Sequence, residues 1–194
     1  MEKKLIIIII FLFFLVSCSQ TEKTIESPNF VFILADDLGY GELGIFGQKL
    51  IETPYIDQLA KEGMILTDHY TGSPVCAPAR AVLMTGLHTG HSPVRGNDEW
   101  RERGDVWSFK AMFEDPKLEG QRPLPDSTRT VANFLQSQGY KTGMVGKWGL
   151  GAPNTKSIPN NKGFDFFYGY NCQRQAHTLY PSHLWKNTER HILN

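Results

Sequence analysis

Two neighbouring aspartates follow an apolar run near the start of the chain. Asp36 and Asp37 come directly after residues 29–35. Adjacent carboxylates repel one another and lose hydration unless a positive group lies between them, and calcium and magnesium take carboxylate oxygens as ligands. Alternatively, one aspartate caps the next turn and the other is solvated. Spacing alone slightly favours this second interpretation over a metal site.

A cysteine and an arginine lie one turn apart at the expected start of a helix. Cys76 and Arg80 enclose the segment Ala77-Pro78-Ala79. A helix N-terminus favours anions through its free N–H groups and its dipole, and Arg80 can offer its planar guanidinium to an oxyanion from the same side. Cys76 could be a reactive thiolate or a small buried residue. The residues alone leave that choice open.

The elements that must position these side chains alternate between strand and helix. The apolar residues 29–35 predict a central strand that is covered on both faces, and residues 64–67 predict a short strand. One helix is expected from Thr53-Pro54 to Gly63, and a second one starts near Pro78 and ends at Gly86.

Further along, residues 92–125 are rich in charge and proline, which predicts a long surface excursion. A third helix is expected with Asp126 or Ser127 as its N-cap and Gly139 at its end. The alternation predicts an α/β sandwich with a largely parallel central sheet flanked by helices. Its ligand site should lie beyond the carboxyl ends of the strands.

Composition excludes several classes of protein. The 194 residues include 20 basic and 20 acidic side chains, so the formal net charge is zero. This balance excludes the basic footprint of a nucleic-acid binder, and no nucleic-acid partner is expected. Three cysteines are too few for a disulfide scaffold. The length allows one modest domain or part of a larger one.

The N-terminus has the features of an export signal. Lys3 and Lys4 precede an apolar stretch that ends in Ser17-Cys18, which predicts a signal peptide over residues 1–17. Its twelve apolar residues would rise only about 18 Å as a helix, too little to cross a bilayer core of roughly 30 Å. The ending resembles a bacterial lipobox, in which Cys18 is lipidated, so residues 18–28 are expected to be a lipidated tether. We therefore expect a lipoprotein of the cell envelope, in the periplasm or outer membrane, held to the membrane by a lipid anchor.

Two cysteines remain after removal of that segment. Cys76 and Cys172 could pair in an oxidising envelope. If Cys76 has another fate, Cys172 is an odd thiol that we expect to be buried.

Four segments together resemble one enzyme family. Residues 76–80 match the C-x-P-x-R signature of the sulfatases, which belong to the alkaline phosphatase superfamily, and residues 36–41 resemble the metal-binding start of these enzymes. Residues 146–148 resemble their second signature, and residues 53–60 resemble a segment between the two. The likeness covers the chain from about residue 28 to its end and implies the fold predicted above.

The resemblance implies an enzyme that cleaves sulfate monoesters. A maturation enzyme would oxidise Cys76 to formylglycine, which supplies the nucleophilic oxygen. Asp36, Asp37 and the modified Cys76 would hold calcium, with magnesium the less expected ion. Arg80 would fix the modified residue, and Lys147 would be both a catalytic and a substrate-binding residue that contacts the sulfate.

Sulfated glycans are the substrates that this analogy suggests. Two rival functions remain. One is a formylglycine-dependent hydrolase of phosphonates or phosphodiesters, and the other is an inactive truncated lipoprotein.

The sequence departs from the family pattern in two respects. Gly149 stands where many sulfatases have a histidine, and His177, as a substrate-binding residue, and His183 are candidates to replace it. The later Asp-Asn metal pair, histidine and lysine of the family are not found in the chain. Residues 29–194 are therefore expected to be the N-terminal part of a catalytic domain, and this segment alone is expected to be inactive.

Overall fold

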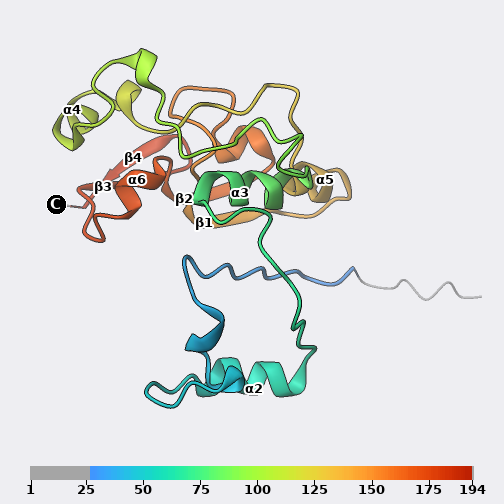
Figure 1. The fold of residues 1–194 in the computed structure, drawn as a ribbon. Helices are drawn as coiled ribbons and strands as arrows, with labels where there is room; N and C mark the ends of the chain where they lie inside the picture. Colours follow the sequence, from blue (N-terminus) through green and yellow to red (C-terminus); the bar gives the residue numbers. More distant parts are fainter. Residues whose placement is uncertain (1–26, 194) are drawn as a thin grey trace, which may run out of the picture. The chain divides into compact units, whose positions relative to one another are not determined.

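The computed structural model describes residues 27–193, so the predicted signal peptide and the lipidation residue Cys18 lie outside the described residues. The chain divides after Ile65 into two compact units, which we describe one at a time (Figure 1). Within residues 27–193, no helix has the combination of length and apolar character that a membrane span requires.

Among the described residues of the first unit, 27–65, there is one α-helix, as the sequence predicts. Helix α2 runs from Pro54 to Glu62 and ends at Gly63, because proline at the first helical position and glycine after the last turn suit the two helix ends. Two 3₁₀ turns, Tyr40–Glu42 and Gly44–Phe46, precede it. Asp57 of α2 accepts hydrogen bonds from the Ile45 N–H at 2.8 Å and from the Thr53 hydroxyl at 3.0 Å, so one carboxylate joins the helix to the preceding turn.

The prediction of two strands in the N-terminal region is wrong. Residues 29–35 and 64–67 have no strand assignment, and Val31 and Ile33 are 86 % and 83 % exposed. An apolar run predicts burial, but a strand also needs a neighbouring strand to pair its backbone N–H and C=O groups. The strands described in the structure belong to a sheet made entirely from residues 143–192.

That sheet forms the centre of the second unit. Its strands are β1 (Gly143–Lys147), β2 (Phe166–Tyr170), β3 (His183–Lys186) and β4 (Glu189–Ile192), and they lie in this order. Strands β1 and β2 are parallel, whereas β3 and β4 continue the sheet in antiparallel fashion. The α/β class is confirmed. The described sheet itself is mixed, because β3 runs antiparallel to β2 and the two-residue turn Asn187-Thr188 then joins β3 to the antiparallel β4.

Helices flank this sheet, and the sequence predicts some of their ends correctly and others not. Helix α3 runs from Cys76 to Thr85 and ends at Gly86, whose φ of 68° suits glycine, as predicted. Helix α5, Val131–Ser137, begins later than predicted, because Thr130 caps it and its hydroxyl accepts from the Asn133 N–H at 3.3 Å. Asp126 and Ser127 are therefore not its cap. The other α-helices described in the second unit are α4 (Phe109–Glu114) and α6 (Gln173–Ala176).

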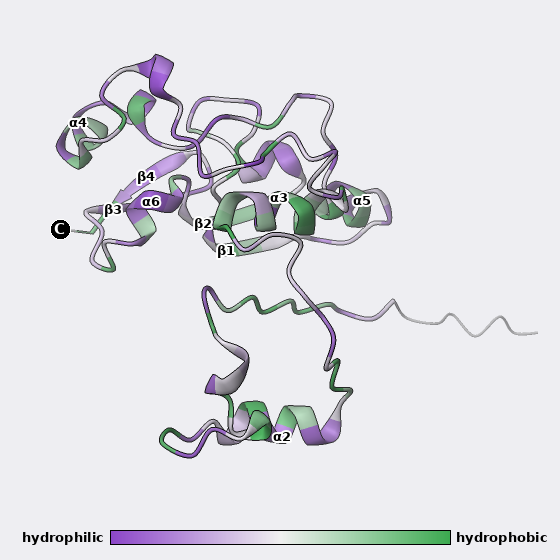
Figure 2. Ribbon diagram, in the orientation of Figure 1, coloured by the Kyte–Doolittle hydropathy of each residue, from purple (hydrophilic) through white to green (hydrophobic). Residues whose placement is uncertain are grey.

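The core of the second unit joins helices and sheet. Figure 2 shows hydrophobic residues along α3 and α5 and hydrophilic ones along β4. Trp148, directly after β1, is fully buried, and its indole N–H donates to the Ser157 carbonyl at 2.7 Å. The buried core residues are Ala77, Ala81, Leu124, Ala132, Trp148, Leu150, Phe164, Phe167 and Trp185.

Residues 92–125 are not the surface excursion that their polarity predicts. Their regular structure is limited to the six-residue helix α4 and short 3₁₀ turns, but Val106 and Glu119 are fully buried. The Glu119 carboxylate accepts from the Trp185 indole at 2.6 Å and lies 2.9 Å from Nε2 of His183. Charged side chains enter an interior when partners replace their hydration, and composition does not reveal those partners.

Candidate active site

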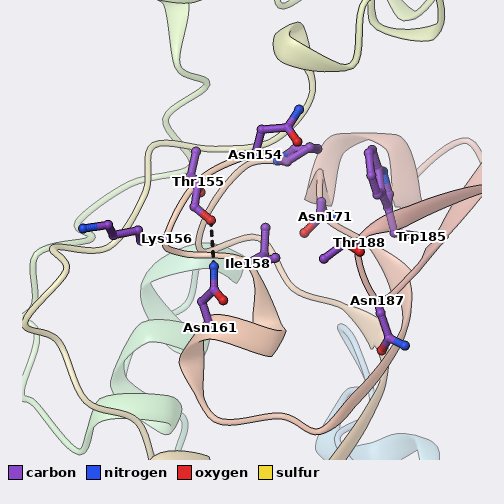
Figure 3. A pocket seen from close by; sticks show the side chains of 10 residues that line it. Asn154, Thr155, Lys156, Ile158, Asn161, Asn171, Trp185, Asn187 and Thr188 are labelled. Atoms are coloured by element: carbon purple, nitrogen blue, oxygen red, sulfur yellow. Dashed lines mark hydrogen bonds between the residues drawn. The ribbon is translucent and has the colours of Figure 1, made fainter.

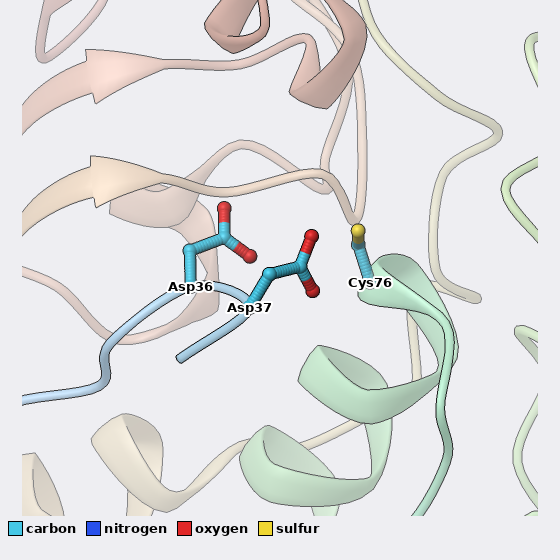
Figure 4. Close-up of side chains that lie close together, drawn as sticks. All are labelled: Asp36, Asp37 and Cys76. Atoms are coloured by element: carbon cyan, nitrogen blue, oxygen red, sulfur yellow. The ribbon is translucent and has the colours of Figure 1, made fainter. Parts of the chain in front are cut away.

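Asp36 and Asp37 occupy consecutive positions of a loop in the first unit (Figure 4). Asp37 has a φ of 58°, in the left-handed region that aspartate tolerates better than most residues. Oxygens of the two carboxylates lie within 4.8 Å of each other. Two oxygens bound to one calcium ion, each about 2.3–2.6 Å from it, are separated by no more than about 5 Å. This pair of hard donors therefore fits one divalent cation.

Cys76 is the first residue of α3 in the second unit (Figure 4). Its thiol is free and only partly buried. Asn97, from the segment before α4, accepts a hydrogen bond from the Ala77 N–H at 2.8 Å and so holds the first turn of the helix. No sequence motif pointed to Asn97, because the segment that carries it has no periodicity.

Arg80 and Lys147 are brought together. Arg80 lies one turn after Cys76, and its Nη1 donates to the Lys147 main-chain carbonyl at 2.5 Å. Lys147 is the last residue of β1 and is only 6 % exposed. The first turn of α3 is thereby attached to the carboxyl end of a parallel strand, where α/β proteins place their ligand sites. The guanidinium of Arg80 and a helix N-terminus at the end of this strand favour an anion.

Gly149 and Gln173 share the space after β1. Gly149 has a φ of 72°, and a β-carbon at this position would lie 3.1 Å from both Cβ and Oε1 of Gln173. Its N–H donates to the Asn171 carbonyl at 3.2 Å. A larger side chain at position 149 would therefore require both a strained backbone and a displaced glutamine. The structure places the Gln173 carboxamide where such a side chain would start.

The two candidate histidines lie in different environments. His177 follows α6 and is exposed. His183, the first residue of β3, is 2 % exposed and lies against Glu119, with its Nδ1 3.1 Å from the Ser182 hydroxyl. His183 thus belongs to a buried polar network, whereas His177 is open to solvent. The predicted role of His177 in substrate binding stays a prediction.

Gln121 links the loops that follow β1 and β2, and sequence reasoning missed it. Its N–H donates to the Gly151 carbonyl at 3.1 Å, and its Oε1 accepts from the Gln173 N–H at 2.9 Å. Its Nε2 donates to Glu99 at 2.9 Å. The side chain is 2 % exposed, so a buried polar residue braces the carboxyl edge of the parallel pair.

Burial raises the pKa values of two groups close to Gln121. Burial raises the pKa of the Glu99 carboxyl, which the nearby Arg174 guanidinium partly offsets. Burial also raises the pKa of the Cys172 thiol, with a further contribution from Glu99. Cys172 is fully buried and free, as expected for an odd thiol, and it is not paired with Cys76.

Comparisons with known proteins agree with these motifs. The family model described as Sulfatase matches residues 28–188. Human Arylsulfatase D is 38 % identical over 159 residues, which cover 79 % of this chain and 25 % of the human protein. The chain thus spans about a quarter of that relative's length.

Solved structures show the same likeness. A structure from work on the metabolism of multiple glycosaminoglycans by Bacteroides thetaiotaomicron superposes with a TM-score of 0.64 and 26 % identity, over 86 % of this chain and 32 % of that one. The structure of Ps i-CgsB in complex with k-i-k-neocarrahexaose superposes with a TM-score of 0.61 and 26 % identity, over 82 % and 36 %. Both share the α/β fold.

Proposed function

The chain belongs to the sulfatase family, and from this premise we propose that the complete protein hydrolyses sulfate monoesters. One observation carries the proposal: the hydrogen bond from Arg80 to the Lys147 carbonyl joins the helix that begins with Cys76 to the strand that ends with Lys147. Residues that are 67 positions apart in the sequence thereby come together around a place suited to an anion.

The cofactors proposed for this reaction are formylglycine at position 76 and a calcium ion. Asp36 and Asp37 have the charge, donor type and oxygen spacing for calcium, and family membership supports a share of that ion for residue 76. When present, these groups supply a hydroxyl nucleophile and the positive charge that favours its ionised form.

The residues of the chain then have distinct tasks. Lys147 binds a sulfate oxygen and stabilises the negative charge that grows on the transferred group. Arg80 keeps the backbone of Lys147 and the first turn of α3 in register, so the nucleophile and the ammonium approach the sulfate from fixed directions. Asn97 holds the Ala77 N–H and limits movement of that first turn.

Sulfated saccharides are the proposed substrate class. The k-i-k-neocarrahexaose in complex with Ps i-CgsB and the glycosaminoglycans of the Bacteroides thetaiotaomicron work support this class, because both are saccharides.

A cell-envelope location is proposed from the N-terminal sequence. Lys3, Lys4 and the apolar stretch before Ser17-Cys18 support export with lipidation at Cys18. The full-length protein should fractionate with membranes, and the Cys18→Ala variant should not. A wild-type protein found only in the soluble fraction would contradict the lipid anchor.

The enzymatic proposal is tested with the full-length protein, co-expressed with a formylglycine-generating enzyme. Mass spectrometry of the peptide containing residue 76 should show an aldehyde in place of the thiol. The converted protein should hydrolyse 4-nitrophenyl sulfate in the presence of calcium, and Cys76→Ala should be inactive. Conversion without sulfate release, or preferential hydrolysis of 4-nitrophenyl phosphate, would contradict the proposal.

A further inference from the structure

A cavity of about 320 Å³ lies next to the carboxyl end of β2 (Figure 3). Its walls come from the loop after β1, from the residue after β2, and from β3 and the turn that follows it. A volume of this size is at the small end of the range for ligand sites in proteins. The cavity lies within the second unit.

Asn171 is the buried polar group that lines this cavity. Its side chain is 0 % exposed, and within residues 27–193 neither Oδ1 nor Nδ2 has a hydrogen-bond partner. A buried carboxamide without partners costs free energy on both its donor and its acceptor side. Asn171 therefore needs a neighbour that both donates and accepts, and a hydroxyl group does both.

Apart from Lys156, the other wall residues are uncharged, and they include polar, aliphatic and aromatic side chains. Asn154, Thr155 and Thr188 contribute amide and hydroxyl groups, and Trp185 contributes its indole. Lys156 is directed away from the cavity in Figure 3, and its Nζ lies 3.1 Å from the Asp126 carboxylate. The lining thus combines hydrogen-bonding groups with an apolar ring and suits an uncharged ligand.

The cavity is also close to the predicted reaction site. The Asn171 carbonyl accepts from the Gly149 N–H at 3.2 Å, and Gly149 is two residues after Lys147. Trp148, between them, donates to the Ser157 carbonyl of the loop that forms one wall. A ligand in the cavity would therefore lie beside the loop that carries the predicted sulfate-binding lysine.

We propose that this cavity binds an unsulfated sugar residue. A pyranose ring offers several hydroxyls that both donate and accept, and it has an apolar face that suits an indole. This inference rests on the proposed function in one respect, namely that the sugar is part of the substrate and adjoins the esterified residue. The assignment makes Asn171 a specificity residue for saccharides.

Binding is measured directly on the full-length protein. D-galactose, D-glucose and N-acetyl-D-glucosamine, all free of sulfate, are tested by calorimetry and saturation-transfer NMR. At least one should bind, and Asn171→Leu, which keeps the size of the side chain and removes its polar atoms, should weaken that binding at least tenfold. Asn154→Gly, which tolerates the φ of 60° at that position, should weaken it less.

The controls separate binding from folding and from hydrolysis. Gln175→Leu removes another buried carboxamide, which interacts with His183 outside this cavity, and should leave sugar binding within twofold. Asn171→Leu should melt at or above the wild-type temperature, because it removes a buried carboxamide without hydrogen-bond partners among the described residues. The sugars carry no sulfate ester, so their binding is measured independently of hydrolysis.

Three results would overturn the inference. These are the absence of binding by all three sugars, equal binding by Asn171→Leu, and a full-length structure in which the protein's own chain fills the cavity. If sugars bind but no sulfate ester is hydrolysed, the proposed function fails while the saccharide site stands.

Discussion

The guanidinium of Arg80 donates to the main-chain carbonyl of Lys147 at 2.5 Å. An arginine in an active site is often expected to bind the substrate directly, but here one of its nitrogens is engaged by the protein itself. The contact ties a helix start to a strand end, and both ends carry predicted catalytic residues. Arg80 therefore has a positioning role in addition to its charge.

Replacing Arg80 with lysine should test that role. Lysine keeps the positive charge but lacks the planar guanidinium that reaches the Lys147 carbonyl and still presents a second nitrogen. We expect kcat/KM for 4-nitrophenyl sulfate to fall about a hundredfold, as for a catalytic group displaced by about 1 Å. Rates are normalised to the aldehyde content at residue 76, because the variant can also reduce conversion. Wild-type kcat/KM in fully converted R80K would contradict the positioning role.

Gln121→Met should loosen the loops that follow β1 and β2. Methionine fills a similar volume but removes the buried hydrogen bonds to Glu99 and to the Gln173 N–H. The free energy of unfolding should fall by about 2–3 kcal/mol, because a lost hydrogen bond costs about 1 kcal/mol and one to a charged partner costs more. Urea unfolding measures the change, and hydrogen exchange should increase in residues 147–151.

The matched control for that experiment is Gln138→Met, because Gln138 is an exposed glutamine beyond α5. Its free energy of unfolding should stay within about 0.5 kcal/mol of wild type. If both variants unfold alike, Gln121 does not brace these loops.

Some helix ends were predictable from the sequence, whereas neither predicted strand belongs to the described sheet. Proline and glycine fix backbone geometry locally, so the start of α2 at Pro54 and the end of α3 at Gly86 follow from single residues. The cap of α5 was misplaced, because Thr130, Ser127 and Asp126 are all competent caps. The choice of Thr130 comes from its reciprocal bonds with Asn133 and its hydroxyl bond to the Lys162 carbonyl.

The site was predictable where it is made of local motifs and not where it depends on distant contacts. Cys76 and Arg80 are one helical turn apart, so their spacing is visible in the sequence. From an irregular, polar segment, Asn97 contacts the first turn of α3, and Gln121 and Glu119 reach the interior. Nothing in their local sequence indicates a buried partner, because the partners lie on other elements.

Asp165→Asn should change how the stability of the folded protein depends on pH. Asp165 accepts from the Thr142 N–H at 2.8 Å, next to the starts of β1 and β2. This backbone hydrogen bond lowers the pKa of the carboxyl below its ordinary value of 3.8, with a further contribution from Gln136. A lowered pKa means that the contribution to stability is fully present above 3.8 and is lost as pH falls through the folded-state pKa.

Thermal melting across that range measures the effect. Wild type should melt higher than D165N near neutral pH, and the difference should shrink as the pH falls below 3.8. Asp105→Asn, which changes an exposed aspartate in another loop, serves as the control and should show no such convergence. A constant difference at all pH values would rule out ionisation of Asp165 as the cause.

Removal of calcium should abolish hydrolysis by the converted full-length enzyme, and added calcium should restore it. The reason lies in Asp36 and Asp37, whose oxygens lie within 4.8 Å of each other and would repel one another without a cation. Each loss of a charged ligand lowers affinity for a hard divalent ion, so Asp37→Asn should raise the calcium Kd by at least about tenfold, a loss of roughly 1.4 kcal/mol.

The control for this prediction is Asp68→Asn. Asp68 is an exposed aspartate that contacts the Thr67 hydroxyl, and its replacement should leave the calcium Kd unchanged. The calcium Kd of each variant is obtained by titrating the chelated protein with calcium. The readouts are calorimetry and the recovery of 4-nitrophenyl sulfate hydrolysis. An unchanged calcium affinity in both Asp36→Asn and Asp37→Asn would show that the ion binds elsewhere.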